Sequence, residues 1–298
     1  MDAIAIEGIT KRYSSLTAVD NLSLRVRQGA IFGLLGPNGA GKTTTLRMIM
    51  NILIPDEGSI RVLDQPVCDR TQDLIGYLPE ERGLYPRMQV RKLVLFFGAL
   101  KGLSEAEADR RAREWLTRFE LADWMEKKLI DLSKGMQQKV QFICAVIHRP
   151  PVVILDEPFA GLDPVNAVTV KDIMLELRGQ GSSIILSTHR MEQVEMMCDS
   201  ICLINKGRNV LDGDLRAIKQ SYGKNTLRIE SSGNDGFLRH PGIENVNHFG
   251  AVVEAKLHPG TDPQEILQAA VQAGARISRF ELLEPPLNDI FIEKVGHA

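Results

Sequence analysis

The residues of this sequence best suited to chemistry are Gly36 to Thr43, GPNGAGKT. They follow an apolar stretch, precede a helix-like one and match the pattern G-x-x-x-x-G-K-[ST]. Glycines let successive backbone N–H groups turn towards phosphate oxygens, and the start of the next helix adds a partial positive charge. Lys42 would reach the β- and γ-phosphates, and the Thr43 hydroxyl would hold Mg²⁺. The motif predicts a nucleoside triphosphate site, and a glycine-rich turn without a ligand is the poorer alternative.

Two adjacent carboxylates, Asp156 and Glu157, end the apolar run VVILDEP. If that run is a strand of a parallel sheet, its end lies beside the phosphate-binding loop. Asp156 would then position Mg²⁺, and Glu157 could polarise the attacking water, a role worth about 10² to 10⁴ in rate. An Asp-Glu pair alone usually starts a solvated loop. Its occurrence together with the phosphate-binding motif favours a catalytic role. His189 ends a similar run, IILSTH, and we expect it to contact the γ-phosphate, although a lone histidine is more often structural.

Strand-like and helix-like segments alternate along most of the chain, which predicts an α/β fold with a parallel sheet. A helical block over about residues 85–150 is predicted to be an insertion between strands of that sheet. After about residue 220 the pattern changes to strand, strand, helix and strand, with Pro263 near the helix start and Gly274 at its end. We therefore expect a main domain over residues 1–220 and a small α+β domain over residues 221–298.

Composition and charge exclude several classes of protein. The formal net charge of -2 gives no general basic field for nucleic acid, and the four cysteines lack the spacing of a zinc site. The N-terminal residues do not resemble a signal peptide. The longest apolar run, Leu93 to Leu100, is far shorter than the roughly 18 to 20 residues of a spanning helix. Any role at a membrane is therefore expected to depend on a partner.

Beyond these motifs, the chain resembles the ATP-binding cassette (ABC) ATPases over about residues 3 to 220. The resemblance rests on an ordered set of matches: Tyr13, GPNGAGKT, YLPEERGLYP, LSKGMQQ, VVILDEP with GLDP, and His189. It implies a P-loop NTPase fold with a mixed-sheet core, an N-terminal antiparallel β subdomain and an inserted helical subdomain. It also implies that ATP and Mg²⁺ are the cofactors.

The resemblance assigns a role to each matching residue. Tyr13 would stack on adenine, Thr44 would touch the α-phosphate, and Glu157 would be the catalytic base. Ser133 and Gly135 would belong to the family's signature motif, and Asp163 to the loop that communicates between paired sites. The full set of nucleotide contacts that it implies is Tyr13, Gly36, Pro37, Asn38, Gly39, Ala40, Gly41, Lys42, Thr43, Thr44, Glu80, Ser133, Gly135 and Asp163, with Thr43, Asp156 and Glu80 at the metal.

Two departures from the family pattern affect this expectation. Lys134 and Met136 stand where the signature motif usually has Gly and Gln, and Lys134 adds a charge that could favour phosphate. Glu80 stands where the family usually has a Gln. A carboxylate there would repel a phosphate charge by about 3 kcal/mol at roughly 6 Å and an effective dielectric near 20. We expect Glu80 to face Mg²⁺ or to pair with Arg82, and a side chain that points to solvent is an equal alternative.

The family includes transporter motors, translation and repair factors, and inert regulators. A second cassette and a long coiled-coil insertion are not evident in this sequence, and Lys42, Asp156, Glu157 and His189 are in place. We therefore predict an ATP-hydrolysing subunit that powers a membrane permease. YLPEERGLYP and the tail FELLEPPLNDIFIEKVG resemble sodium, drug and peptide exporter ATPases. The alternative is a soluble ABC ATPase that acts on ribosomes or nucleic acid.

The expected partners follow from this interpretation. Two chains, identical or pseudo-homologous, would close on two ATP·Mg²⁺ about a two-fold axis. The helical block would dock on an integral membrane permease, and nucleic acid is not expected. The chain would then be cytoplasmic, on the inner face of the cell membrane. The role of the C-terminal domain is open.

Overall fold

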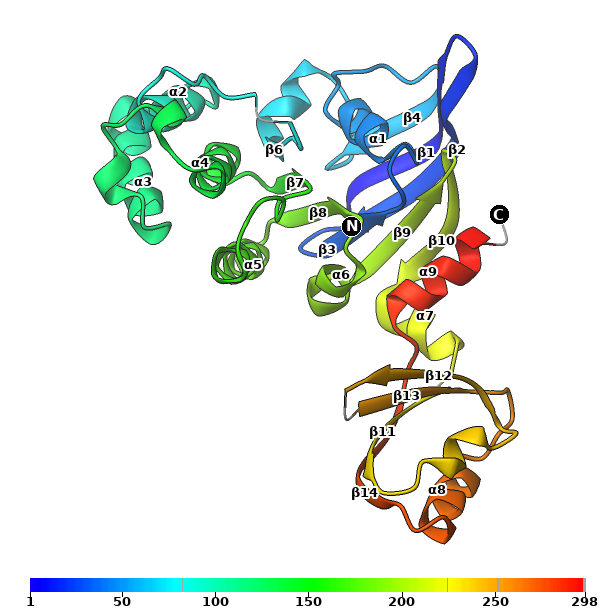
Figure 1. Cartoon of the computed structure of the whole chain (residues 1–298). Helices are drawn as coiled ribbons and strands as arrows, with labels where there is room; N and C mark the ends of the chain where they lie inside the picture. The colour runs from blue at the N-terminus through cyan, green and yellow to red at the C-terminus, as the bar shows by residue number, and fades with distance from the viewer. Residues whose placement is uncertain (82, 224, 251, 297–298) are drawn as a thin grey trace. The chain divides into compact units, whose positions relative to one another are not determined.

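The computed structural model describes residues 1–81, 83–223, 225–250 and 252–296. The chain packs as two compact units, Met1–Asp214 and the part from Leu215 onward. In Figure 1 the colour runs from blue at the N-terminus to red at the C-terminus, so the second unit is drawn in yellow to red. Within the described residues, no helix combines the length and apolarity that crossing a membrane requires.

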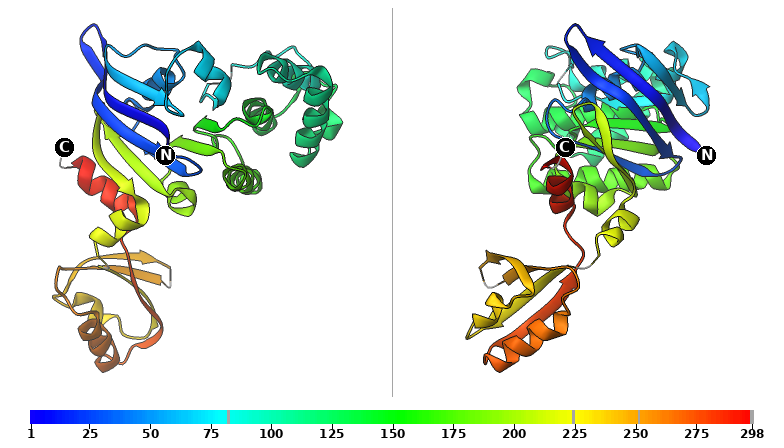
Figure 2. Two further views of the ribbon diagram at one scale, coloured as in Figure 1. Left: turned by 180° about the vertical axis from the view of Figure 1, so that it is seen from behind. Right: turned by 90° about the vertical axis from the view of Figure 1, so that its right-hand side faces the viewer.

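The first unit begins with an antiparallel sheet in the order β2-β1-β4-β5. Its strands are β1 (Asp2–Tyr13), β2 (Leu16–Arg27), β4 (Glu57–Val62) and β5 (Gln65–Pro66). In β2 buried and exposed residues alternate from Leu22 onward, which is the pattern of a strand with one face on a core. Figure 2 shows this sheet, in blue, lying against one side of the central sheet.

The central sheet has the order β10-β9-β3-β8-β7-β6. Its strands are β3 (Ile31–Leu35), β6 (Ile75–Leu78), β7 (Val152–Asp156), β8 (Ser183–Thr188), β9 (Ser200–Asn205) and β10 (Arg208–Asp214). All but β10 run parallel. The residues of β3, β7 and β8 are buried throughout, because helices and the antiparallel sheet cover both faces. The expected mixed sheet and N-terminal antiparallel subdomain are thus confirmed.

Helices fill both sides of the central sheet. Figure 1 shows α1 (Lys42–Ile49) on one side, with α5 (Pro164–Gly179) and α6 (Met191–Met197) on the other. Leu46, Met48 and Ile49 of α1 share one apolar core with strands of both sheets. Because α1 is held on both sides by this core, its first residue is fixed against the ends of the parallel strands.

The predicted helical block lies between β6 and β7. It consists of α2 (Val90–Leu100), α3 (Glu105–Arg118) and α4 (Lys134–Val146), with short 3-10 turns at Ala122–Trp124 and Leu129–Asp131. Phe142 of α4 packs on Phe119, which in turn packs on Trp115 of α3. These aromatic contacts join α3 to α4, whose first residue follows Ser133.

The second unit is a small α+β fold. It contains α7 (Leu215–Ser221), β11 (Thr226–Ser232), a 3-10 turn (Gly236–Arg239), β12 (Ile243–Phe249), β13 (Val252–Leu257), α8 (Pro263–Gln272), β14 (Arg276–Leu283) and α9 (Leu287–Gly296). Its sheet is antiparallel in the order β12-β13-β11-β14, and α8 packs on it through Ile266 and Ala270. The predicted strands β11, β13 and β14 and the helix α8 are confirmed, whereas β12 and α9 were not predicted.

Candidate functional site

A hollow of about 370 Å³ opens where the carboxyl ends of β3 and β7 meet the start of α1. Leu16 and Ala18 of β2 also border it. The predicted site residues that line it are Tyr13, Asn38, Gly39, Gly41, Lys42, Thr43, Thr44, Glu80, Asp156 and Glu157. Gly36, Pro37 and Ala40 belong to the same loop but do not line the hollow. The structure therefore brings most of the predicted residues together from distant parts of the sequence.

The loop before α1 needs glycine at two positions for steric reasons. Gly36 has φ of 152°, and a Cβ there would lie 2.2 Å from the carbonyl oxygen of Ile204. Gly41 has φ of 107°, and a Cβ there would lie 2.4 Å from the carbonyl oxygen of Ala18. Gly41 also caps α1 without a side-chain hydrogen bond, so the first N–H groups of the helix are not occupied by a cap. Such groups at a helix start favour anions.

The ammonium group of Lys42 is held by its own loop. Its Nζ donates to the carbonyl oxygens of Gly36 at 2.8 Å and Pro37 at 3.1 Å. Burial lowers the pKa of Lys42, and the neighbouring carboxylates of Glu157, Asp156 and Glu80 oppose that shift. A cation partly stripped of water beside a hollow binds phosphate oxygens strongly, because little water remains to be displaced.

Thr43 connects the loop to the end of β7. Its Oγ1 donates to Oδ2 of Asp156 at 3.0 Å. Asp156 is 1% exposed, and burial raises its pKa while the hydrogen bond from Thr43 opposes the rise. Oxygen donors of this kind fit Mg²⁺, which usually binds proteins through one or two carboxylates and keeps waters and phosphates for the rest.

Glu157 is held by residues at the end of the adjacent strand β8. Its Oε2 accepts from Oγ1 of Thr188 at 3.0 Å, and its Oε1 accepts from the backbone N–H of His189 at 3.1 Å. The ring Nδ1 of His189 lies 2.6 Å from the same Oε1. Glu157 adopts φ of 49°, a conformation that non-glycine residues rarely take and that is concentrated at functional sites. The predicted His189 therefore contacts Glu157 and lies outside the residues that line the hollow.

Glu80 and Tyr13 both line the hollow. Glu80 is exposed to solvent and also lines the hollow with Asp156 and Glu157, so it can reach a ligand there. The predicted alternative partner, Arg82, lies outside the described residues. Tyr13 is 43% exposed, and Nζ of Lys11 lies 5.9 Å from its ring centroid. The exposed ring leaves a face on which a flat group can stack.

Ser133, Gly135 and Asp163 lie outside the hollow. Ser133 is exposed and caps α4, its Oγ accepting from the N–H of Met136 at 3.3 Å. A Cβ at Gly135 would lie 3.5 Å from the carbonyl oxygen of Gly161, so the start of α4 packs on the segment that leads to Asp163. Asp163 caps α5 by accepting from the N–H of Asn166, which lowers the pKa of its carboxyl. The start of α4 and the cap of α5 thus form one surface of the chain.

Three polar side chains at the site were missed from the sequence. Thr188 holds Glu157, and the buried Gln138 and Gln141 of α4 donate to backbone carbonyls of the loops behind the hollow. Thr188 could have been found, because it directly precedes His189 at the end of a predicted strand. The glutamines had a weaker signal, which was their spacing of three positions on one face of α4.

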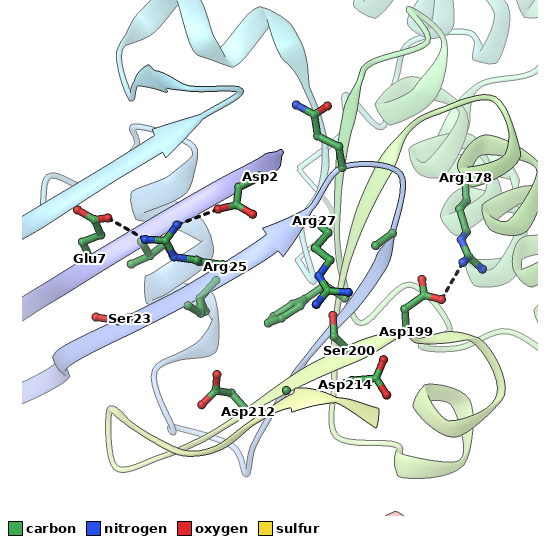
Figure 3. A pocket seen from close by; sticks show the side chains of 16 residues that line it. Asp2, Glu7, Ser23, Arg25, Arg27, Arg178, Asp199, Ser200, Asp212 and Asp214 are labelled. Carbon is green, nitrogen blue, oxygen red and sulfur yellow. Dashed lines mark hydrogen bonds and ion pairs between the residues drawn. The ribbon is translucent and has the colours of Figure 1, made fainter. Parts of the chain in front are cut away.

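A second, larger hollow of about 770 Å³ lies between β1–β2 and β9–β10 (Figure 3). Two of its guanidinium groups are engaged by carboxylates. Arg178 contacts Asp199 at 2.7 Å, and Arg25 lies between Asp2 at 3.1 Å and Glu7 at 3.3 Å. These pairs neutralise one another, so the smaller hollow with its glycine loop and Lys42 is the better candidate for a phosphate ligand.

Sequence comparison agrees with the geometry of the smaller hollow. Residues 19–160 match the family model described as ABC transporter, and residues 213–295 match that of the ATP-binding protein DrrA1-3-like C-terminal domain. The chain is 46% identical over 294 residues to YhaQ of Bacillus subtilis, an uncharacterized ABC transporter ATP-binding protein, with 98% of each chain covered. The chain belongs to the ATP-binding proteins of ABC transporters. As a member of this family it is an ABC-type ATPase.

Two further relatives extend the comparison. This ABC ATPase is 34% identical to the Nod factor export ATP-binding protein I of Sinorhizobium fredii, with 99% of this chain and 86% of that protein covered. A solved structure described as the ATP-binding subunit of an ABC transporter superposes with a TM-score of 0.70 at 32% identity, and covers 74% of this chain and 93% of that one. The family and the fold predicted from the sequence are confirmed, and ATP is the nucleotide of the family.

Proposed function

We propose that this chain is the ATP-hydrolysing subunit of a membrane exporter and acts as a pair of cassettes that closes on ATP. One observation carries the proposal: Ser133 and Gly135 are turned outside the hollow that holds the rest of the predicted site. A second copy, or a pseudo-homologous partner, would bring its own Ser133 and Gly135 to the nucleotide held by the first. Such a contact between like surfaces fits two-fold symmetry.

Each residue of the hollow has a task in this scheme. The loop N–H groups and Lys42 would bind the phosphates, with Thr44 at the α-phosphate and Tyr13 against adenine. Thr43 and Asp156, with Glu80 nearby, would hold Mg²⁺, which supplies charge neutralisation at the β- and γ-phosphates when bound. Glu157 would accept a proton from the attacking water, and His189 would contact both Glu157 and the γ-phosphate. Asp163 would lie at the contact between the two chains.

Opening and closing would convert hydrolysis into movement. ATP bound by both chains favours the closed pair over the open one, and loss of the γ-phosphate removes that preference. The start of α4 would respond directly to loss of the γ-phosphate, because it would contact that phosphate only in the closed pair. Export is the direction favoured by the likeness to the Nod factor export protein.

The helical block is the proposed docking surface for the permease. It exposes the aromatic pair Tyr85 and Phe96, whose rings lie 5.7 Å apart, together with Leu100 and Ile130. Clustered exposed apolar side chains of this kind mark interaction sites. Docking there would place the chain at the cytoplasmic face of the membrane through its partner. Nucleic acid has no role in this proposal.

The variant Glu157→Gln tests the paired mechanism. It removes the proton acceptor and keeps the side chain's size, so turnover should fall by about 10² to 10⁴ while ATP still binds. Gel filtration with ATP and Mg²⁺ should then show a dimer that disappears with ADP. The matched control adds Ser133→Arg, which leaves the hollow unchanged but places bulk at the proposed contact. That double variant should bind ATP and remain monomeric, and an ATP-dependent dimer in spite of it would contradict the scheme.

Purification from native membranes tests the partner. A tagged chain should bring down an integral membrane protein. Recovery of ribosomes or of DNA ends in its place would favour the soluble ABC ATPase that is the alternative.

A further inference from the structure

Helix α4 carries two buried glutamines on one face. Gln138 and Gln141 are each 4% exposed and are separated by three positions, so their side chains lie on the same side of the helix. A buried amide is retained in a packed interior only where its donors find acceptors. In both residues the acceptors are backbone carbonyls of loops that contribute to the nucleotide hollow.

Gln141 makes the more specific contact. Its Nε2 donates to the carbonyl oxygen of Pro79 at 3.1 Å and to that of Glu81 at 3.4 Å. These two carbonyls belong to the residues immediately before and after Glu80. One amide group therefore bridges the backbone on both sides of the residue whose carboxylate lines the hollow.

Gln138 supports the neighbouring loop. Its Nε2 lies 3.5 Å from the carbonyl oxygen of Pro158, the residue that follows Glu157. The helix that begins beside Ser133 is thus connected by side-chain amides to the loops of both Glu80 and Glu157. The contact of Gln138 is longer and weaker than those of Gln141.

We propose that Gln141 is a positioning residue that sets the place of Glu80 at the nucleotide-bound metal. With both flanking carbonyls held by one amide, the Glu80 loop has little freedom to move away from the hollow. Without that amide, the carbonyls of Pro79 and Glu81 lose a partner and the loop shifts to find water or another donor. The inference rests on the proposed function, since it takes Glu80 to act at Mg²⁺.

The chain offers a matched control on the same helix. Gln137 lies one turn from Gln141, and both border a hollow of about 290 Å³ with Leu84 and Pro86. Gln137 also donates to two backbone carbonyls, those of Leu129 at 3.2 Å and Leu132 at 3.0 Å, but not to the Glu80 loop. Replacing either residue removes the same kind of amide from the same surroundings.

The test compares Gln141→Met with Gln137→Met in the full-length chain. Methionine keeps the length and the helix propensity and removes the donors. Hydrogen–deuterium exchange without nucleotide should show faster exchange at residues 79–81 in Gln141→Met only. Calorimetric titration of ATP at several Mg²⁺ concentrations should show that Gln141→Met needs more Mg²⁺ than the wild-type chain. The Mg²⁺ concentration that gives half of the gain in ATP affinity should rise by about tenfold, as it does when other outer-shell partners of a metal are lost.

The two readouts separate the possible failures. Unchanged exchange at residues 79–81 in Gln141→Met, or an equal change in Gln137→Met, would overturn the inference. Faster exchange with an unshifted Mg²⁺ dependence would overturn the role assigned to Glu80 at the metal. If Glu157→Gln forms no ATP-dependent dimer while the Mg²⁺ shift is present, the paired mechanism fails and the positioning role of Gln141 stands.

Discussion

The ring Nδ1 of His189 lies 2.6 Å from Oε1 of Glu157, and the backbone N–H of His189 donates to the same oxygen at 3.1 Å. One residue at the end of β8 therefore holds the carboxylate at the end of β7 through both its side chain and its backbone. Parallel neighbouring strands make this possible, because their carboxyl ends lie at one edge of the sheet. The two residues predicted separately from sequence act on one another directly.

Replacing His189 tests what that contact does. In His189→Ala the backbone N–H remains, but the imidazole is lost from Glu157 and from any phosphate. We expect kcat to fall by about 10² or more, the usual size for loss of a group that acts in proton transfer or charge stabilisation. The comparison variant is Thr188→Val, which removes the hydrogen bond to the other oxygen of Glu157. Equal losses in the two variants would mean that His189 only orients Glu157.

Replacing Thr43 tests the proposed metal site. Thr43→Val keeps the shape but removes the hydroxyl, which is the proposed metal ligand and the donor to Asp156. The Mg²⁺ concentration for half-maximal ATPase activity should therefore rise at least about tenfold. Chemical denaturation should also show a loss of about 1–3 kcal/mol, because the buried Asp156 loses a partner. In Thr45→Val a fully buried hydroxyl that donates to Gly41 is lost instead. That control should lower stability without a change in the Mg²⁺ dependence, and a matching Mg²⁺ shift there would refute the assignment.

Most residues that line the smaller hollow could be picked out from the sequence, because they belong to short motifs that follow one another along the chain. GPNGAGKT is recognisable from eight consecutive residues, and Asp156 and Glu157 come at the end of an uninterrupted apolar run. In a parallel sheet the two motifs then lie at the same edge, because both follow the carboxyl ends of strands. What remained open concerned Glu80, whose neighbours depend on how its loop packs.

Other features could not be read from local patterns. Strand β12 has no buried position, so it lacks the alternation that reveals a strand with one buried face. Gln138 and Gln141 are polar residues in a helix, which predicts a surface position, and only the loops packed over α4 make them buried. The bond between His189 and Glu157 likewise depends on the strand order β8-β7, which no single segment encodes.

Replacing Glu80 tests the effect of its charge. Three carboxylates line the hollow, so without a metal Glu80 should oppose a triphosphate, and Glu80→Gln should bind ATP about tenfold more tightly in the presence of EDTA. This is less than the ~3 kcal/mol of the bare charge pair, because Glu80 is exposed and water screens its charge. With Mg²⁺ present the gain should shrink or reverse. The control is Glu81→Gln, an exposed side chain that does not line the hollow. Equal affinities of Glu80→Gln and the wild-type chain in EDTA would show that Glu80 does not face the phosphates.

The half-buried His148 predicts how stability depends on pH. Burial, with a smaller contribution from the charge of Lys101, lowers the pKa of His148 from 6.5 to about 4. Between these values the unfolded chain binds a proton that the folded chain does not, so stability falls as the pH drops from about 6.5 to 4. The full shift corresponds to at most about 3 kcal/mol.

Urea denaturation of the wild-type chain and of His148→Gln across this range should show a smaller pH dependence in the variant. The difference between the two curves isolates His148 from the carboxylates that titrate in the same range, and parallel curves would mean that His148 keeps its ordinary pKa in the folded chain.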